Sequence, residues 1–148
     1  MYRAVAALWL LIPPLAAGGL GQAGASVAAD AAHFGAQVRM VPQAGYTIAE
    51  LQAPGATLIR EYESPAGLIF GISWRGAAMP DLRQLLGDSF AAYQQAAQAQ
   101  AGAEHRRGPL HLVIGNLEVD NAGGPRAFQG RAVRLDLVPA QLSAAVVQ

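Results

Sequence analysis

Two stretches with alternating apolar and polar residues, Thr57 to Glu63 and Leu68 to Arg75, constrain the fold of this chain more than any other feature. A period of two is typical of β-strands. The residues between them, Ser64-Pro65-Ala66-Gly67, are typical of a tight turn, because proline presets the first turn angle and glycine accepts the left-handed conformation that closes the loop. The sequence therefore predicts an antiparallel hairpin.

This turn also predicts a register. With Ser64 opposite Leu68, the cross-strand pairs are Tyr62 with Phe70, Arg60 with Ile72, and Leu58 with Trp74. This register places the large apolar side chains on one face, which we expect to form the centre of the core.

The other face of the hairpin would carry Glu61 and Glu63. Two carboxylates on one strand face could serve acid–base chemistry on a glycoside. An exposed acidic edge that discourages strands from aggregating explains them as well, and we favour that interpretation.

Arg60 is the one candidate binding residue. The predicted register places its guanidinium among apolar side chains, where a charge needs an ion pair or a path to water. Glu50 and Asp81 are the candidate partners. We expect a structural ion pair, and the alternative is an arginine that anchors a ligand.

A long helix is predicted from Pro80 to Gly102. Proline is favoured at the first helical position, and Asp81 places a carboxylate at the positive end of the helix. Apolar residues then recur at steps of three and four, namely Leu82, Leu85, Leu86, Phe90, Tyr93 and Ala97. Gly87, inside this pattern, predicts either a bend or a close packing contact.

The remaining segments predict strands on either side of this helix. We expect a short helix between Ser26 and Met40, a strand from Tyr46 to Gln52, a strand from Leu110 to Asp120 that slips in phase at Gly115-Asn116, a loop from Asp120 to Pro125, and a strand from Arg126 to Leu137. Strands without repeated βαβ spacing indicate an α+β fold, an antiparallel sheet with one long amphipathic helix packed on one face.

The first residues have the three parts of a secretory leader: Arg3, an apolar run from Ala4 to Ala17, and small residues up to Ala25. Pro13-Pro14 would interrupt a membrane-spanning helix, so we expect cleavage. The sequence offers a small-x-small site before Ser26, and an earlier cut between Ala17 and Gly19 is the alternative. We predict a leader over residues 1–25, a single domain over residues 26–148, no transmembrane segment after leader removal, and a periplasmic or secreted product.

Charge and composition exclude several classes of protein. The chain has ten basic and ten acidic side chains, and only Arg3 among them lies in the predicted leader. A nearly neutral domain argues against a nucleic-acid partner. The chain has no cysteine, which excludes disulfides, thiol chemistry and cysteine zinc sites.

No motif predicts catalysis, a cofactor or a metal. Gly19 to Gly24 match the spacing G-x-G-x-x-G but lack the strand and helix that a dinucleotide site needs. Ser73 lies inside a predicted strand, outside the strand-to-helix turn that a nucleophile elbow needs. The histidines, His33, His105 and His111, lack the spacing of paired metal ligands. We assign no catalytic, cofactor-binding or metal-binding residue.

Several short motifs resemble the DUF2844 family of exported proteobacterial proteins. They are Arg60 to Gly67, Phe70 to Trp74, Pro80-Asp81-Leu82 with Leu85-Leu86-Gly87, Arg126-Ala127-Phe128 with Gly130-Arg131-Ala132, and Leu137-Val138-Pro139. The likeness spans about Val27 to Pro139, although Ala77 stands where the family often has proline and Pro125 stands where we expect a bulkier residue. The resemblance implies an export signal and one compact domain, and it implies no activity, cofactor or residue role.

We therefore expect a non-catalytic binding or accessory module of the bacterial envelope, whose partner is another envelope protein or a small ligand. Two alternatives stay open. One is a hydrolase of cell-envelope polymers with a site that only the fold assembles. The other is an inhibitor of an exported enzyme that presents the hairpin tip, Ser64 to Gly67.

Overall fold

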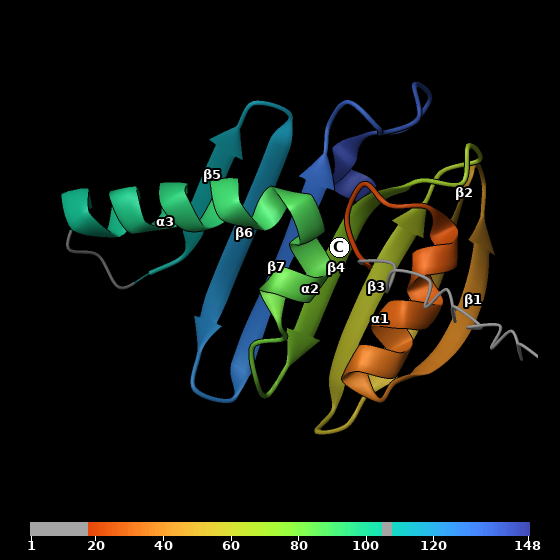
Figure 1. Cartoon of the computed structure of the whole chain (residues 1–148), viewed down its shortest axis with the longest axis horizontal. Helices are drawn as coiled ribbons and strands as arrows, with labels where there is room; N and C mark the ends of the chain where they lie inside the picture. The colour runs from red at the N-terminus through yellow and green to blue at the C-terminus, as the bar shows by residue number, and fades with distance from the viewer. Residues whose placement is uncertain (1–17, 105–107) are drawn as a thin grey trace, which may run out of the picture.

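A computed structural model of the chain describes residues 18–104 and 108–148. Seven strands form one antiparallel sheet in the order β1-β2-β3-β4-β7-β6-β5 (Figure 1). Their bounds are β1 Gln37–Gln43, β2 Tyr46–Ala53, β3 Thr57–Glu63, β4 Ile69–Gly76, β5 Leu110–Ile114, β6 Leu117–Gly124 and β7 Ala127–Arg134. The chain builds β1 to β4 as successive hairpins, passes through the helices, and returns at the opposite edge as β5. This arrangement confirms the predicted α+β class.

The helices lie on one face of the sheet, with α1 (Val27–Phe34) over β1 to β3 and α3 (Phe90–Glu104) across β5 and β6 (Figure 1). The predicted long helix is divided. It begins as α2 (Leu82–Leu86), changes to the 3-10 turn η2 (Gly87–Ser89), and continues as α3. Gly87 has a φ of 50°, a left-handed conformation that favours glycine. The predicted bend at Gly87 is confirmed.

Helix α2 begins two residues later than predicted, at Leu82 instead of Pro80. Asp81 is the N-cap, and its side chain accepts hydrogen bonds from the backbone N–H groups of Arg83 and Gln84. Pro80 lies outside the helix. A capping carboxylate satisfies amide groups that have no partner within the helix, which explains why Asp81 is the N-cap.

The main core lies between the helices and the sheet. All six apolar residues predicted to line the helix, from Leu82 to Ala97, contribute to it, and Leu85 and Leu86 are fully buried. The sheet contributes residues from several strands, namely Leu51, Ile59, Ile72, Trp74, Val119 and Ala132. Burying apolar area of this extent is the main source of stability.

A second, smaller core lies on the opposite face of the sheet. It consists of Tyr62, Phe70, Val133 and Val147, and partly buried apolar residues between Leu137 and Val146 pack against it. The segment after β7, which includes the 3-10 turn η3 (Ala144–Val146), therefore covers part of the face that has no helix. Sequence analysis did not predict this cover.

The predicted register of the central hairpin is wrong by one residue. Leu58 pairs with Arg75, Arg60 with Ser73 and Tyr62 with Gly71. The register shifts next to Tyr62, so Phe70 is an extra residue in β4, as in a β-bulge. The rings of Tyr62 and Phe70 still lie on the same face, 6.2 Å apart between centroids. The prediction that the large apolar side chains share one face is therefore wrong, because Ile72 and Trp74 face the main core whereas Tyr62 and Phe70 lie in the second core.

The faces of the central hairpin differ from the prediction most clearly at Glu61. This side chain faces the main core and has none of its surface exposed. The strand that carries it, β3, lies in the interior of the sheet. The interpretation of Glu61 as part of an exposed acidic edge is therefore wrong.

Three other boundaries differ from the predictions. The helix after Ser26 ends at Gly35, whose φ is 60°, and Gln37 begins an unpredicted strand, β1. Strand β6 continues to Gly124 through the segment predicted as a loop. The phase slip at Gly115-Asn116, which indicated a bulge or a tight turn, is a tight turn, so the predicted strand from Leu110 to Asp120 is divided into β5 and β6. The described residues contain no helix long and apolar enough to span a membrane.

Residues 18–25, which sequence analysis assigned to the leader, pack into the domain. Leu20 is 2 % exposed and belongs to the main core. The Gly21 N–H donates to the Ile69 carbonyl at 2.8 Å, and Ala23 forms a β-bridge with Leu68. This part of the chain therefore contributes to the fold.

Candidate functional site

A row of polar side chains crosses the whole sheet on the face opposite the helices. Successive cross-strand pairs place one member on each strand, in the order Arg39, Glu50, Arg60, Ser73, Arg131, Asp120 and His111. Opposite charges directly across a sheet stabilise each other. From Arg39 to Asp120 the charges alternate along this row except at Ser73, which separates two arginines.

On one side of Ser73, Glu50 lies between two arginines. Arg60 donates from Nε to Glu50 Oε1 at 3.0 Å, and Arg39 donates from Nε to Glu50 Oε2 at 3.1 Å. The hydrogen bonds from Arg39 and Arg60 lower the pKa of Glu50. Glu50 is thus the ion-pair partner predicted for Arg60. The other predicted partner, Asp81, lies at the start of α2, where it pairs with His33.

On the other side of Ser73, Arg131 is held by two acids. Its Nε donates to Asp120 Oδ2 at 2.7 Å, and its Nη2 pairs with Glu118. Partial burial would raise the pKa of Asp120, but the hydrogen bonds from His111 and Arg131 lower it overall. Arg131 is therefore fixed in position, because a guanidinium with several bonded partners loses its rotational freedom.

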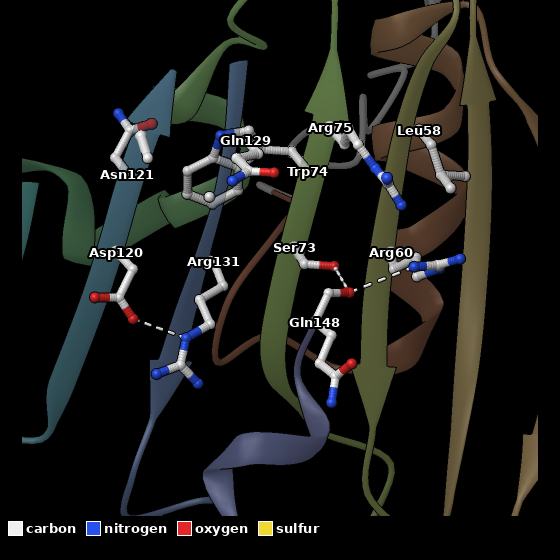
Figure 2. Close-up of a pocket in the computed structure, with 12 residues that line it drawn as sticks. Leu58, Arg60, Ser73, Trp74, Arg75, Asp120, Asn121, Gln129, Arg131 and Gln148 are labelled. Carbon is white, nitrogen blue, oxygen red and sulfur yellow. Dashed lines mark hydrogen bonds and ion pairs between the residues drawn. The ribbon is translucent and has the colours of Figure 1, made fainter. Parts of the chain in front are cut away.

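The row has no acid between Arg60 and Arg131, and a backbone oxygen of the C-terminal segment lies at this gap beside Ser73. The backbone oxygen of Gln148 accepts from Ser73 Oγ at 2.7 Å, from the Tyr62 hydroxyl at 2.8 Å and from Arg60 Nη1 at 3.4 Å. Figure 2 shows Ser73 and Arg60 converging on this oxygen. These donors define a place where an oxygen with negative charge density is well coordinated.

A cavity of about 350 Å³ opens beside this oxygen. Its lining contains three arginines, Arg60, Arg75 and Arg131, and one acid, Asp120. Its other lining residues are Leu58, Ser73, Trp74, Asn121, Ala122, Gln129, Gly130 and Gln148. Arg75 is exposed, and no acidic side chain in the described part of the chain pairs with it. Because Glu50 balances Arg60, and Asp120 and Glu118 hold Arg131, Arg75 is the cation of this lining that the described acids leave unbalanced.

The chemistry available in this cavity is binding through hydrogen bonds and charge. Ser73 donates to Gln148, and among the described residues no imidazole lies beside it. His33 and His111 are bonded to Asp81 and Asp120, and His105 lies outside the described residues. Within residues 18–104 and 108–148, no group of three or more histidine and acidic side chains could hold a metal ion.

A second cluster of polar groups lies under α1, on the helix side of the sheet. Asp30 of α1 and Glu61 of β3 have no exposed surface. Burial and the neighbouring Asp30 carboxyl raise the pKa of Glu61 to about 9. The Gln84 side chain donates to Asp30 Oδ1 at 2.6 Å. No arginine pairs with either acid in the described part of the chain, which is unusual for buried carboxyl groups.

Sequence analysis identified Arg60 but missed the other groups of the cavity. Arg131 and Gln148 come from segments far from Arg60 in the sequence, so no local spacing indicated them. The correct hairpin register would have revealed that Arg60 lies opposite Ser73. Glu61 and Glu63, considered as a carboxylate pair, have different neighbours: Glu61 lies against Asp30, and Glu63 lies beside Gly24.

The comparisons with known proteins agree with the resemblance found in the sequence. The family model described as "Protein of unknown function (DUF2844)" matches residues 16–147. The chain belongs to the DUF2844 family. No curated protein and no solved structure matches it. The family match begins before Gly18, so the whole N-terminal segment of the described fold lies within it.

Proposed function

We propose that this DUF2844 protein is an exported binding module that holds a small molecule through an oxyanion, a carboxylate or a phosphate, in the cavity beside Ser73. The observation that carries this proposal is the gap in the charged row. Two arginines flank Ser73 without an acid between them, and an oxygen acceptor occupies the gap. A ligand oxyanion in the adjoining cavity would bind through the remaining donors of the lining, Arg75 and the Gln129 side chain.

Arg75 supports a negatively charged ligand over a neutral one. Its guanidinium lines the cavity and has no acidic partner in the described part of the chain, whereas Arg60 and Arg131 are held by acids. A free arginine can form two parallel hydrogen bonds to a carboxylate or phosphate. The paired arginines would position the ligand, and Arg75 would supply most of the net attraction.

Export supports a role in the periplasm or outside the cell, and it remains a prediction from the leader at the N-terminus. The two alternative functions also remain predictions. For a hydrolase, the cavity offers Ser73 without a nearby base among the described residues. For an inhibitor, the hairpin tip exposes Pro65 and Ala66. Neither observation favours the alternative over a ligand site.

The proposal can be tested by amide NMR of the exported, purified protein during titration with inorganic phosphate and, separately, with succinate. Saturable shifts are expected at Ser73, Arg75, Gln129 and Gln148, with one of the two probes binding more tightly. Binding should weaken as sodium chloride is added, because salt screens exposed charges. Absence of saturable shifts with both probes, or shifts confined to the helix side of the sheet, would contradict the proposal.

A further inference from the structure

The buried acids Asp30 and Glu61 lie where the N-terminal segment enters the fold. A Cβ atom at Gly18 would overlap the Asp30 carboxylate, so the Gly18 backbone lies directly against that group. The Gly19 backbone N–H also faces Asp30. The next residue is fixed, because the Leu20 N–H donates to the Leu85 carbonyl at 2.8 Å. The backbone of Gly18 and Gly19 is thus held beside the two acids.

The surroundings of these acids lack a strong positive charge. Among the described residues, the Gln84 side chain donates a hydrogen bond to Asp30 Oδ1, and the other three oxygens of the two acids are buried without a hydrogen-bond partner. The nearest cationic candidate on α1, His33, pairs with Asp81. Glu63, farther along β3, lies beside Gly24 and adds only negative charge. Two buried carboxyl groups without a cation are strongly disfavoured.

We propose that the leader is cut on one side or the other of Gly18, and that the α-amino group released there becomes the positive partner of Asp30 and Glu61. The proposal rests on the export half of the proposed function. A peptidase of the exporting cell adds water across the peptide bond, leaving a carboxylate on the leader and an amine on Gly18 or Gly19, which then takes up a proton. The ammonium forms next to the Asp30 carboxylate.

The alternative cut before Ser26 conflicts with the fold. It would remove Leu20 from the core and would break the Ala23–Leu68 bridge and the Gly21–Ile69 hydrogen bond. A cut beside Gly18 keeps all of these contacts. Gly18 also provides a small residue at the cut, as leader processing requires.

This arrangement couples processing to stability. Before cleavage, the nitrogen of Gly18 or Gly19 is a neutral amide and the two acids lack a charge partner. After cleavage, the ammonium ion balances the charge of the Asp30 carboxylate, and Glu61 keeps its proton. The precursor therefore folds less stably than the processed protein, which favours an unfolded chain during transport.

The first test is the N-terminal sequence of the full chain after production and export in a proteobacterial host. Gly18 or Gly19 as the first residue supports the inference. A first residue farther along, such as Ser26, overturns it but leaves the export half of the proposed function intact. Retention of Met1 overturns both this inference and the export half of the proposed function.

The second test measures the pKa of the α-amino group, which reports its pairing with Asp30. The α-amino group of the processed protein is dimethylated with ¹³C and titrated by NMR. Its pKa is expected above the ordinary value of about 8, and the Asp30→Asn variant should lower it again. Asp88→Asn, at an exposed acid, is the matched control and should leave it unchanged. A wild-type value at or below about 8 would overturn the pairing, even if Asp30→Asn fails to fold.

Discussion

The carboxyl group of Glu61, on β3, faces that of Asp30, on α1, in the interior of the protein. Neither side chain is exposed. Two neighbouring buried carboxyl groups cannot both ionise without a large increase in energy, so the pair retains one proton near neutral pH. The free energy of unfolding that depends on this buried pair therefore falls as pH rises, whereas the contribution of the surface ion pairs falls as pH decreases.

Glu61→Gln should therefore stabilise the protein at neutral and alkaline pH. The pKa of Glu61 is about 9 in the folded protein and near 4.5 when unfolded. Between these values the folded state binds more protons, so the free energy of unfolding falls as pH rises. The variant should remove this loss, with a gain on the order of 1 to 3 kcal/mol at pH 8. Urea unfolding from pH 5 to 9 would measure it, and a slope as steep as that of the wild type would contradict the account.

Glu50→Gln is predicted to have the opposite effect. Hydrogen bonds from Arg39 and Arg60 lower the pKa of Glu50, so its stabilising contribution is present above the unfolded-state pKa and disappears as pH falls through the folded-state value. The variant should unfold more readily at pH 7, and the difference from the wild type should shrink in acid. The same urea series measures it. Equal stability at pH 7 would show that these ion pairs contribute nothing.

Leu20→Ala should destabilise the processed protein by about 2 to 5 kcal/mol, because Leu20 is almost fully buried in the main core. Val113→Ala is the matched control, since Val113 is 58 % exposed on β5 and should change stability by less than about 0.5 kcal/mol. Thermal unfolding compares the two variants. Similar melting temperatures for both would mean that residues 18–25 do not belong to the folded domain.

Gly71→Ala should release the segment that ends at Gln148. A Cβ atom at Gly71 would overlap Val147, so the added methyl group pushes Val147 out of the second core. We expect a loss of about 1 to 3 kcal/mol and a large shift of the Gln148 amide signal. Gly102→Ala, in α3, meets open space and should stabilise the helix slightly. An unchanged Gln148 signal in the Gly71 variant would contradict this role for the glycine.

The elements that local patterns determine were predictable from the sequence. The stripe from Leu82 to Ala97 identified the helix, and the turn residues identified the hairpin. The register failed because Phe70 is a bulged residue, and the sequence does not indicate that one residue is extra. Strand β1 was missed because its residues are mostly exposed and show no clear alternation of apolar side chains.

The candidate site was much less predictable than the fold. A cross-strand row depends on which strands become neighbours, and β7 reaches β4 only after the chain has passed through three helical segments and two strands. Arg131 and Ser73 therefore have no relationship in the sequence. Arg60 was noticed only because a charge among apolar residues needs a partner.

The affinity for inorganic phosphate, measured by calorimetry in low salt for the wild type, Arg75→Gln and Arg39→Gln, tests the proposed anion site most directly. Arg75 lines the cavity, whereas Arg39 lies on the same face at the edge of the sheet, outside it. Loss of a charge-assisted contact of about 1.4 kcal/mol predicts a dissociation constant about tenfold higher for Arg75→Gln. Arg39→Gln should change it less than about twofold, as a remote exposed charge. Equal effects of the two substitutions, or none from Arg75→Gln, would contradict the account.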